Sequence, residues 1–515
     1  MTAAALRASF RAAATGVLAV GAGLAAGQLV AAVRDPATAP ILAVGSTVID
    51  HTPTALKDWA IRQFGTHDKL VLLSSIAVAV LALAVTSGLI ATRSLTAGIA
   101  AQATMLAVAG YAVLTRPFAT VTDLAPTAAA GAVSILVLLA LHRIDRPPSD
   151  RRSPQQEARA GVGRRDFVLA SGVSATMTAA GFVGADRLAA RRSAIDVRLP
   201  EAADPAPPLP RGIDRLVPGV TPLRTPNGTF YRVDTELTVP AVDASDWSLR
   251  IDGDVENPYS LSYSELLGRP LVERNITITC VSNEIGGGYA GGATWRGVLT
   301  RDLLAAARVK DPGRPDLQVL STSTDGFTIS TPLEALTDDR DAILAVGMNG
   351  APLPRSHGFP ARLVTPGLYG MLGCTKWVTR LTVTTYAARK AYWTQRGWTT
   401  TGEIKPTARI DVPRSFASVQ RGRVLIGGTA WAQRRGVVRV QVSVDNGPWE
   451  DASMGPDVNI DYWRQWYFVW ADAAAGQHSV RARVVYGHDQ LQTSKRAGVF
   501  PNGSSGVEER FFVVR

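Results

Sequence analysis

The stretch NITITCVSNEIGGGYAGGATWRGVLTRDLL, from Asn275 to Leu304, decides how the second half of the chain is interpreted. Its first five residues alternate polar and branched apolar side chains, which is the pattern of a β-strand. Cys280 ends this strand, and a loop rich in glycine follows. The apolar spacing in VLTRDLLAAARV, which continues past Leu304, predicts a helix. The sequence therefore places a single thiol between a strand and a flexible polar loop.

A thiol in this position suits either a metal site or an ordinary core. Thiolates are soft donors that bind transition metals, and glycine lets a large cofactor approach because it adds no side chain. A lone cysteine is also among the small apolar residues that fill cores. Cys374 is the other cysteine of the chain, and a Cys280–Cys374 bridge is allowed in an oxidising compartment.

The first part of the chain has the composition of a membrane protein. The sequence has 515 residues, of which 46% are hydrophobic and 19% charged, and five long uncharged stretches are rich in Ala, Leu and Val. Each stretch exceeds the roughly 17 residues that cross a bilayer core. They lie between Arg11 and Arg34, Lys69 and Arg93, Arg93 and Arg116, Asp123 and Arg143, and Asp166 and Asp186. We therefore expect five transmembrane helices rather than helices buried in a soluble domain.

The net charge of +11 is better explained by membrane topology than by nucleic-acid binding. Arginines gather before the first stretch, between the second and third, and between the fourth and fifth, whereas the loop from Arg34 to Lys69 mixes acids with bases. These arginines are Arg7, Arg11, Arg93, Arg143, Arg146, Arg151, Arg152, Arg159, Arg164 and Arg165. Cytoplasmic loops carry the excess of basic residues. The chain is therefore expected to be a multi-pass protein of the cell membrane, with everything after about residue 190 on the extracytoplasmic side.

The stretch GRRDFVLASGVSATMTAAGFVGADRLAARR resembles a twin-arginine export signal that is retained as an anchor. Arg164 and Arg165 are followed by the bulky Phe167, a moderately apolar span and small residues. The alternative is an ordinary basic flank of a transmembrane helix. An export signal of this kind would suit a domain that folds around its cofactor before it crosses the membrane.

Composition divides the chain into five segments. Residues 1–145 form a four-helix transmembrane region, and residues 146–198 hold a cytoplasmic linker and the fifth transmembrane helix. Residues 199–227 are rich in proline and are expected to be a tether. Residues 228–412 mix strands with short helices, which predicts an α+β domain. Residues 413–515 contain only strands.

The strands of the last segment predict a β-sandwich of immunoglobulin-like type. RVLIGGTAWAQ, VVRVQVSVDNGPWED, WRQWYFVWA, HSVRARVVYG and ERFFVVR all alternate with a period of two. Asn446-Gly447 is a hairpin-turn signal, and several short strands separated by turns are typical of such sandwiches.

Two further groups of residues could bind a ligand. His357, Arg362 and Lys376 lie among prolines and glycines in MNGAPLPRSHGFPARLVTPGLYGMLGCTKW, and such donors on rigid loops suit an anionic group such as a phosphate. Arg362 could instead be an exposed strand residue. Tyr231 and Arg232 lie in NGTFYRVDTELTVP, which could equally be an ordinary first strand.

Several of these motifs together resemble the sulfite oxidase family of molybdopterin enzymes. They are TCVSNE, WRGVLTRDLL, MNGAPLPRSHGFPARLV, GLYG and TKW. The likeness covers about residues 220–515, including the all-strand tail, which resembles the dimerisation domain of that family. It implies a mixed α+β molybdopterin domain followed by an immunoglobulin-like sandwich, a molybdenum–molybdopterin cofactor, and a homodimer.

The resemblance also assigns roles to individual residues. Cys280 matches the cysteine whose thiolate binds molybdenum. Trp295 matches an aromatic residue near the substrate pocket, and Arg464 in YWRQWYF a substrate-facing arginine. One more pterin contact is implied between Ser321 and Asp325. The implied contacts to the pterin and its phosphate are Phe230, Tyr231, Arg232, His357, Arg362, Cys374, Thr375 and Lys376.

Some residues depart from the family pattern. Sulfite oxidases carry arginines just after the metal-binding cysteine, where this chain has Asn283, Glu284 and Ile285. A carboxylate close to the metal would repel the sulfite dianion. Phe327 stands where the resemblance implies the substrate-pocket tyrosine. These departures weaken sulfite as the substrate and leave the metal site intact.

The sequence therefore predicts a membrane-anchored, extracytoplasmic oxidoreductase that carries out two-electron oxo-transfer on a small substrate. A true sulfite oxidase is one alternative. A non-catalytic membrane protein that binds a partner through its outer domains is another. The chain has no Cys-x-x-Cys-His motif for c-type haem and no suitably placed pair of histidines in its membrane spans. The redox partner is therefore left open, with a quinone and a cytochrome as candidates. The helices are expected mainly to anchor the protein.

Overall fold

The computed structural model describes residues 3–53, 56, 59–60, 63–64, 68–116, 119–145, 154–192 and 195–515. The chain separates into two units. We call the first, Met1–Ile195 with Asp234–Ala241, the helical unit. The second, Asp196–Val233 with Val242–Arg515, is the strand-rich unit.

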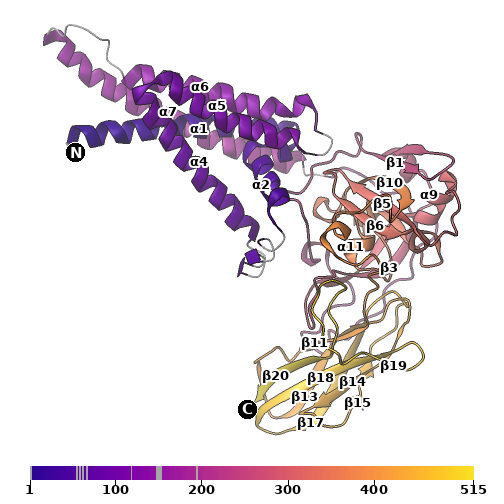
Figure 1. Ribbon diagram of the computed structural model, residues 1–515. Helices are drawn as coiled ribbons and strands as arrows, with labels where there is room; N and C mark the ends of the chain where they lie inside the picture. Colours follow the sequence, from indigo (N-terminus) through magenta and orange to yellow (C-terminus); the bar gives the residue numbers. More distant parts are fainter. Residues whose placement is uncertain are drawn as a thin grey trace. The chain divides into compact units, whose positions relative to one another are not determined.

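The helical unit is built from long apolar helices (Figure 1). They are α1 (Ala3–Val33), α2 (Pro40–His51), α4 (Asp68–Arg93), α5 (Leu95–Leu114), α6 (Ala125–Asp145) and α7 (Pro154–Arg192). Five segments are long and apolar enough to cross a membrane: Leu6–Val33, Lys69–Arg93, Leu95–Leu114, Val121–Ile144 and Arg165–Leu188. The five predicted spans are therefore confirmed as apolar helices of membrane-spanning length.

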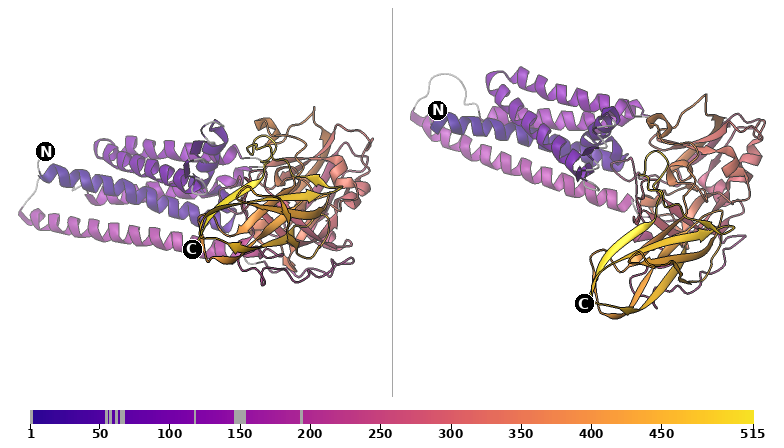
Figure 2. Two further views of the ribbon diagram at one scale, coloured as in Figure 1. Left: turned by 90° about the horizontal axis from the view of Figure 1, so that it is seen from below. Right: turned by 60° about the horizontal axis from the view of Figure 1, so that its bottom comes forward.

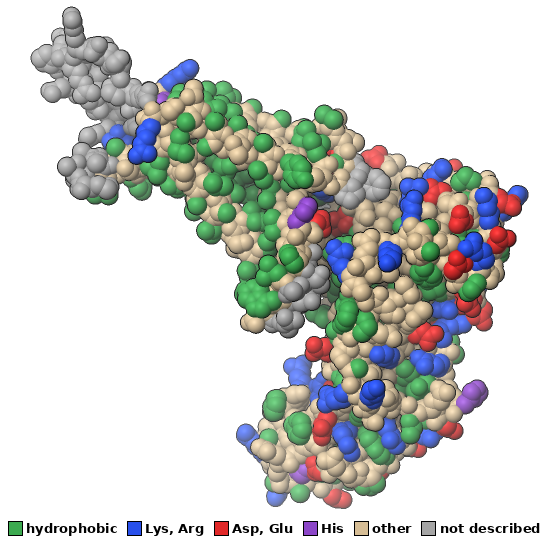
Figure 3. Space-filling model, in the orientation of Figure 1, with side chains coloured by type: hydrophobic (Ala, Val, Ile, Leu, Met, Phe, Trp, Pro, Cys, Tyr) green, Lys and Arg blue, Asp and Glu red, His purple; other side chains and the backbone are tan. Residues whose placement is uncertain are grey.

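Small residues let two of these helices approach closely. A Cβ atom added at Gly16 of α1 would lie 2.0 Å from the carbonyl oxygen of Ala84, and one added at Gly88 of α4 would lie 2.1 Å from that of Ala12. Small residues at such contacts are typical of helix pairs in membranes. Large apolar side chains instead cover the outside of the unit, as Figure 3 shows, and Leu70, Val108, Leu136 and Met177 are examples.

The linker before the fifth span differs from the prediction. Arg146, Arg151 and Arg152 lie outside the described residues, but α7 already begins at Pro154. Its first turns, PQQEARAGVGRR, contain mostly Gln, Glu, Ala and Arg, which favour helix. The second half of the predicted linker and the fifth span thus form one continuous helix.

The first part of the strand-rich unit is an α+β domain with two sheets (Figure 1). One sheet has the order β2-β1-β10-β5-β6, with β1 and β10 parallel, and the other has the order β3-β4-β7-β8, with β9 paired to β7. The strands are β1 (Ser248–Gly253), β2 (Tyr259–Ser262), β3 (Val272–Thr279), β4 (Ala290–Leu299), β5 (Leu317–Ser323), β6 (Thr328–Pro332), β7 (Ile343–Met348), β8 (Ala351–Pro352), β9 (Arg362–Val364) and β10 (Val378–Thr385). The helices are α8 (Tyr263–Leu267), α9 (Thr300–Ala307), α10 (Leu333–Thr337) and α11 (Gly370–Gly373).

The second part consists of two sheets that share one apolar core. Their orders are β11-β13-β17-β16 and β12-β20-β18-β14-β15, with β19 paired to β18, and Figure 2 shows the strands side by side in orange to yellow. They are β11 (Thr407–Val412), β12 (Ser418–Val419), β13 (Gly422–Trp431), β14 (Val437–Val444), β15 (Glu450–Asp451), β16 (Ser453–Met454), β17 (Arg464–Ala473), β18 (Gly476–Tyr486), β19 (Gln490–Leu491) and β20 (Glu508–Val514). Ile426, Val442, Trp466, Val484 and Phe512 belong to their common core.

The predicted turn between β14 and β15 is present, one residue earlier than its sequence signal. Gly447 N donates to Val444 O at 2.8 Å, and the two central residues, Asp445 and Asn446, have φ of 49° and 60°. Positive φ at both central positions is the geometry of a type I′ hairpin turn.

The Pro-rich segment of residues 199–227 is not a free tether, and the structure corrects this expectation. Its backbone is held at intervals along the strand-rich unit: Ala203 N donates to Leu271 O at 2.8 Å, and Thr221 N to Asp411 Oδ2 at 2.9 Å. Leu223 is buried, and its carbonyl accepts a hydrogen bond from Tyr462 at 2.6 Å. Apolar residues between the prolines supply the burial that a tether lacks.

The segment Asp234–Ala241, by contrast, belongs to the helical unit. Lys69, at the start of α4, donates to the carbonyl oxygens of Asp234 at 3.0 Å and Glu236 at 2.6 Å. The helical unit therefore holds the chain directly after Tyr231 and Arg232.

Candidate functional site

Cys280 lies at the closed end of the β3–β4 hairpin. Cys280 N donates to Tyr289 O at 2.9 Å, and Asn283 N donates to Cys280 O at 3.1 Å. The Asn283 side chain accepts from Tyr289 N at 2.8 Å, so it closes the glycine-rich loop. Gly286, with φ of 74°, supplies a backbone conformation that other residues rarely adopt. The loop thus holds the thiol in a fixed place beside the strand end.

The Cys280 thiol is 8% exposed. Burial raises its pKa, and hydrogen bonds from the backbone and side chain of Ser282 oppose that change. Cys374 is also buried, and both cysteines are free thiols, so the bridge that the sequence allows is not formed.

Tyr231, Arg362 and Cys374 gather around Cys280. Burial raises the pKa of Tyr231, the charges of both cysteines raise it further, and Arg362 lowers it. Gly370, at the start of α11, faces the same place, because a Cβ atom there would lie 3.8 Å from Cys374 Cβ and 4.0 Å from Tyr231 Oη. The fold therefore brings together residues that are far apart in the sequence.

Arg362 is a buried cation without a carboxylate partner. It is 4% exposed, which excludes the alternative of an exposed strand residue. Its Nη1 donates to His357 O at 3.1 Å and its Nη2 to Cys374 O at 3.5 Å, while Nε has no partner. Among the described residues it forms no ion pair, and burial lowers its pKa. A charge buried in this way is costly unless an anion balances it.

His357 is held as a neutral imidazole. It ends the short turn Arg355–His357 and is 3% exposed. Burial, followed by the charges of Arg362 and Arg232, lowers its pKa to about 4. Its Nε2 lies 2.9 Å from Asn227 O, and a carbonyl only accepts, so we assign the proton to Nε2. Nδ1 is then an acceptor.

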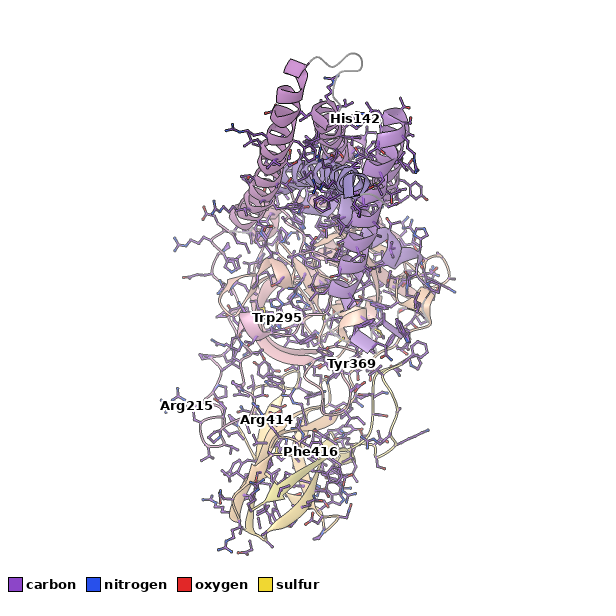
Figure 4. All side chains as sticks on the ribbon, turned by 90° about the vertical axis from the view of Figure 1, so that its left-hand side faces the viewer. His142, Arg215, Trp295, Tyr369, Arg414 and Phe416 are labelled. Atoms are coloured by element: carbon purple, nitrogen blue, oxygen red, sulfur yellow. The ribbon has the colours of Figure 1, made fainter. Side chains whose placement is uncertain are left out.

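Trp295 supports this site from behind. It is 0% exposed on β4, where Figure 4 labels it, and its Nε1 donates to Ile276 O at 3.1 Å. The Arg362 guanidinium lies 5.0 Å from its ring centroid, and the ring of Phe230 lies 5.8 Å away, edge to face. Trp295 has no exposed surface, and its contacts position Arg362 and Phe230. Its predicted place near the substrate pocket stays a prediction.

The remaining predicted contacts differ in burial. Phe230 is buried, whereas Arg232 is exposed but close enough to affect His357. Thr375 is buried and bonds Ser321 through their hydroxyls at 2.5 Å. Lys376 Nζ lies 4.6 Å from the Trp377 ring centroid, and the position of Gly358 lies between Lys376 and Arg362.

Four buried hydroxyl groups near these residues escaped the sequence analysis. The side-chain oxygens of Thr279, Ser323, Thr324 and Thr365 have no hydrogen-bond partner. Most buried polar atoms in proteins are paired, so these hydroxyl groups are available to bind a polar ligand. The stretch Ser321–Asp325 was the only sequence signal, and it covers two of the four.

Arg464 is not brought to this site. Its side chain donates to Gly455 O at 2.9 Å and to Val437 O at 3.2 Å and lies 3.8 Å from Asp457, all within the C-terminal strands. Tyr462, two residues earlier, instead joins the cluster that contains Val281 and Tyr369.

The structure also shows where Glu284 and Phe327, which depart from the family pattern, lie. Glu284 is exposed on the loop after Cys280. Phe327 belongs to an aromatic group, with its ring 5.1 Å from that of Tyr392 and 6.3 Å from that of Trp393.

His357 should make the stability of the cofactor-free protein depend on pH. Its pKa is about 4 in the fold against 6.5 ordinarily, so the unfolded chain takes up the proton first as the pH falls. The free energy of unfolding should therefore fall by about 3 kcal/mol from this group as the pH drops from above 6.5 to below 4. Chemical unfolding of wild type and His357→Gln across this range checks it. Equal pH slopes in the two proteins would contradict the buried neutral imidazole.

Known proteins share these features. Residues 236–393 match the family described as oxidoreductase molybdopterin binding domain. Sulfite oxidase of Gallus gallus is 31% identical over 274 residues, which cover 45% of this chain and 59% of that protein. A nitrate reductase of Oryza sativa subsp. japonica is 35% identical over 193 residues, covering 33% and 21%.

A crystal structure of the sulfane dehydrogenase SoxCD from Paracoccus pantotrophus overlaps with a TM-score of 0.49 at 24% identity, covering 56% of this chain and 80% of that one. The chain spans about half the length of the sulfite oxidases it matches. The matched region contains Cys280, His357, Arg362 and Lys376. Residues 236–393 therefore form a molybdopterin-binding oxidoreductase domain that is similar to that of sulfite oxidases.

Proposed function

We propose that this chain is a membrane-anchored oxidoreductase that uses molybdenum–molybdopterin for two-electron oxo-transfer on a small substrate. One observation carries the proposal: the uncompensated buried cation Arg362 lies with the buried thiol Cys280 in one polar site. A metal bound to an anionic organic group supplies what both residues lack, a soft acid for the thiolate and a negative charge for the guanidinium.

The residues present fit such a group. Within the described part of the chain, no three His, Cys, Asp or Glu side chains gather to hold a metal, so Cys280 would be the single protein ligand and the cofactor would complete the coordination. Arg362 would bind the phosphate, and His357 Nδ1 would accept a hydrogen bond from the pterin. Thr279, Ser323, Thr324 and Thr365 offer further hydroxyl groups.

When bound, the metal supplies the redox chemistry, and the protein supplies binding and electrostatics. Ser282 donates two hydrogen bonds to the Cys280 sulfur, which favour its thiolate form. Burial raises the pKa of both Tyr231 and Tyr369, so each stays protonated and can donate a hydrogen bond. Burial of the site limits access of water.

The substrate is proposed to be small and different from sulfite. Asn283 closes the loop in place of an arginine, and the neighbouring Glu284 is acidic. Neither residue attracts a dianion. Sulfite itself is the second candidate, favoured by the sequence match to sulfite oxidases. A non-catalytic binding protein is the alternative outside the enzyme class.

The first test is the metal and pterin content of the purified full-length protein from a host that makes the cofactor. We expect close to one molybdenum and one pterin per chain, measured by elemental analysis and by fluorescence of the oxidised pterin. A protein that folds but contains neither would favour the non-catalytic alternative.

We further propose that the strand-rich unit lies on the extracytoplasmic side. Support comes from the five apolar helices and from the arginines in alternate loops. The electron partner is then a quinone in the membrane or a cytochrome outside it. A homodimer through the immunoglobulin-like C-terminal strands is consistent with the exposed Phe416 and Phe511.

Replacing Arg164 and Arg165 by lysines should leave the strand-rich unit in the cytoplasm, because a twin-arginine pathway requires both arginines. Protease treatment of spheroplasts measures this: the strand-rich unit of wild type should be cleaved and that of the double variant protected. Replacing Arg187 and Arg198 by lysines is the matched control and should leave the protein accessible. Equal accessibility of all three proteins would contradict a twin-arginine route.

A further inference from the structure

A polar cavity that is open to solvent lies in the strand-rich unit, outside the residues assigned to the cofactor. Its volume is ≈ 510 Å³, between residues 401–406 and the C-terminal strands. Its lining includes Glu403, Lys405, Arg435, Tyr486, Thr493 and Asn502. Ligand pockets typically enclose a few hundred Å³ with a few well-placed polar groups, so its size suits a small molecule.

Two cations line this cavity, and neither has a carboxylate partner among the described residues. Lys405 Nζ donates to Gly503 O at 2.5 Å, and Arg435 Nη2 donates to Ile404 O at 3.3 Å. The Arg435 guanidinium also lies 5.1 Å from the centroid of the Tyr486 ring. An ammonium has three donors and a guanidinium five, so each cation keeps donors for a ligand.

Two other arginines of this unit, one buried and one half-buried, are neutralised by carboxylates. Arg409 lies 2.8 Å from Asp411, and Arg340 lies 2.7 Å from Asp338. Glu403 is the acidic residue in the cavity lining, but it is exposed and forms no ion pair with either cation. Burial lowers the pKa of Lys405, as expected for a cation whose desolvation nothing offsets.

The wall around the two cations is rigid. Gln492, which also lines the cavity, uses all of its polar atoms in the fold: its carbonyl accepts from Ala408 N and Val484 N, both at 3.0 Å, and its amide donates to Gly506 O at 2.7 Å. Because the polar atoms of Gln492 are already hydrogen-bonded, Gln492 has none left for a ligand. Lys405 and Arg435 are then the groups that select the ligand.

We propose that this cavity binds a small anion through Lys405 and Arg435, with an oxyanion or carboxylate head between the two cations. Thr493 and Asn502 offer further hydrogen bonds to it. The cavity has room for an inorganic oxyanion or for an organic acid that carries the same head. This site goes beyond the proposed function, because none of its lining residues is assigned to the cofactor.

Tyr369 connects the cavity with the cofactor site. Its hydroxyl accepts from Lys405 N at 3.3 Å. Burial raises its pKa, this hydrogen bond lowers it, and the charge of Cys280 raises it. Gly503, whose carbonyl accepts a hydrogen bond from Lys405, packs closely against Tyr369. A Cβ atom added at Gly503 would lie 2.6 Å from the Tyr369 hydroxyl oxygen. An anion bound at Lys405 would therefore be separated from Cys280 by Tyr369, which interacts with both residues.

Isothermal titration calorimetry of the full-length protein tests this site. Sodium sulfate and sodium succinate are titrated separately into wild type, Lys405→Gln and Arg435→Gln at low ionic strength. Each substitution should raise the dissociation constant about tenfold or more, because it removes a charge-assisted hydrogen bond. Arg435→Lys should retain most of the binding, and Lys390→Gln, an exposed cation elsewhere, should leave it unchanged.

The outcomes separate the ligand sources. Binding of sulfate alone would identify an inorganic oxyanion, and binding of succinate alone an organic carboxylate. Absence of heat with both salts in the millimolar range, or equal affinity in the wild type and both glutamine variants, would overturn the proposal. Calorimetry needs no turnover, so a protein without molybdenum would contradict the proposed function and leave this result readable.

Discussion

Cys280→Ser should abolish both molybdenum retention and turnover. A serine hydroxyl remains protonated at neutral pH and is a hard donor, whereas the thiolate is the soft ligand that the metal prefers. Within the described residues no other cluster of metal ligands exists to replace it. Elemental analysis should find near-stoichiometric molybdenum in the wild type and almost none in the variant.

Cys374→Ser is the matched control, because it changes the other buried thiol. Arg362 donates to the backbone carbonyl of Cys374 at 3.5 Å and also to its side chain. Serine keeps the carbonyl and places a hydroxyl acceptor where the sulfur was. We expect the control to retain most of its molybdenum. Full activity of Cys280→Ser, or an equal loss of metal in both variants, would refute the ligand assignment.

Arg362→Met should separate cofactor binding from folding. Methionine fills a similar volume but removes the charge, so the phosphate loses its cation and the purified protein should lack the pterin. The cofactor-free protein should be no less stable than the wild type, because an uncompensated buried charge is removed. Pterin content and the thermal midpoint, measured on protein from a host unable to make the cofactor, give the two readouts.

Arg409→Met provides the opposite case. Arg409 is buried like Arg362 but is paired with Asp411 at 2.8 Å. Removing one partner of such a pair costs about 3–5 kcal/mol, because the other charge stays buried. This variant should be less stable, yet its folded fraction should contain pterin. A loss of pterin in Arg409→Met equal to that in Arg362→Met would show that the effect of Arg362 is only structural.

Local patterns predicted much of the fold because the responsible forces are local. Long uncharged stretches give apolar helices wherever they occur, and alternating side chains gave β3 up to Thr279. The fold class also followed, as apolar helices, a mixed α+β domain and a strand-only C-terminal part. The immunoglobulin-like type of that last part stays a prediction.

The sequence could not predict how deeply some residues are buried, because burial depends on what packs against them. The alternating pattern around Trp295 does not indicate how deeply its side chain is buried. In the fold Trp295 has no exposed surface, because it packs against Phe230 and Arg362. Proline content suggested a tether for residues 199–227, but Leu223 and its neighbours are covered by residues more than two hundred positions later.

The sequence by itself determined the apolar helices of membrane-spanning length, the strand that ends just before Cys280, and the thiol and cations that we propose as ligands. Only the tertiary structure decided which of them meet. It joined Cys280, Tyr231, Arg362 and Cys374, sent Arg464 elsewhere, and left Lys405 and Arg435 facing one cavity. The physical reason is that charge and hydrogen-bonding capacity belong to single residues, whereas their compensation requires a partner that only the folded chain brings near.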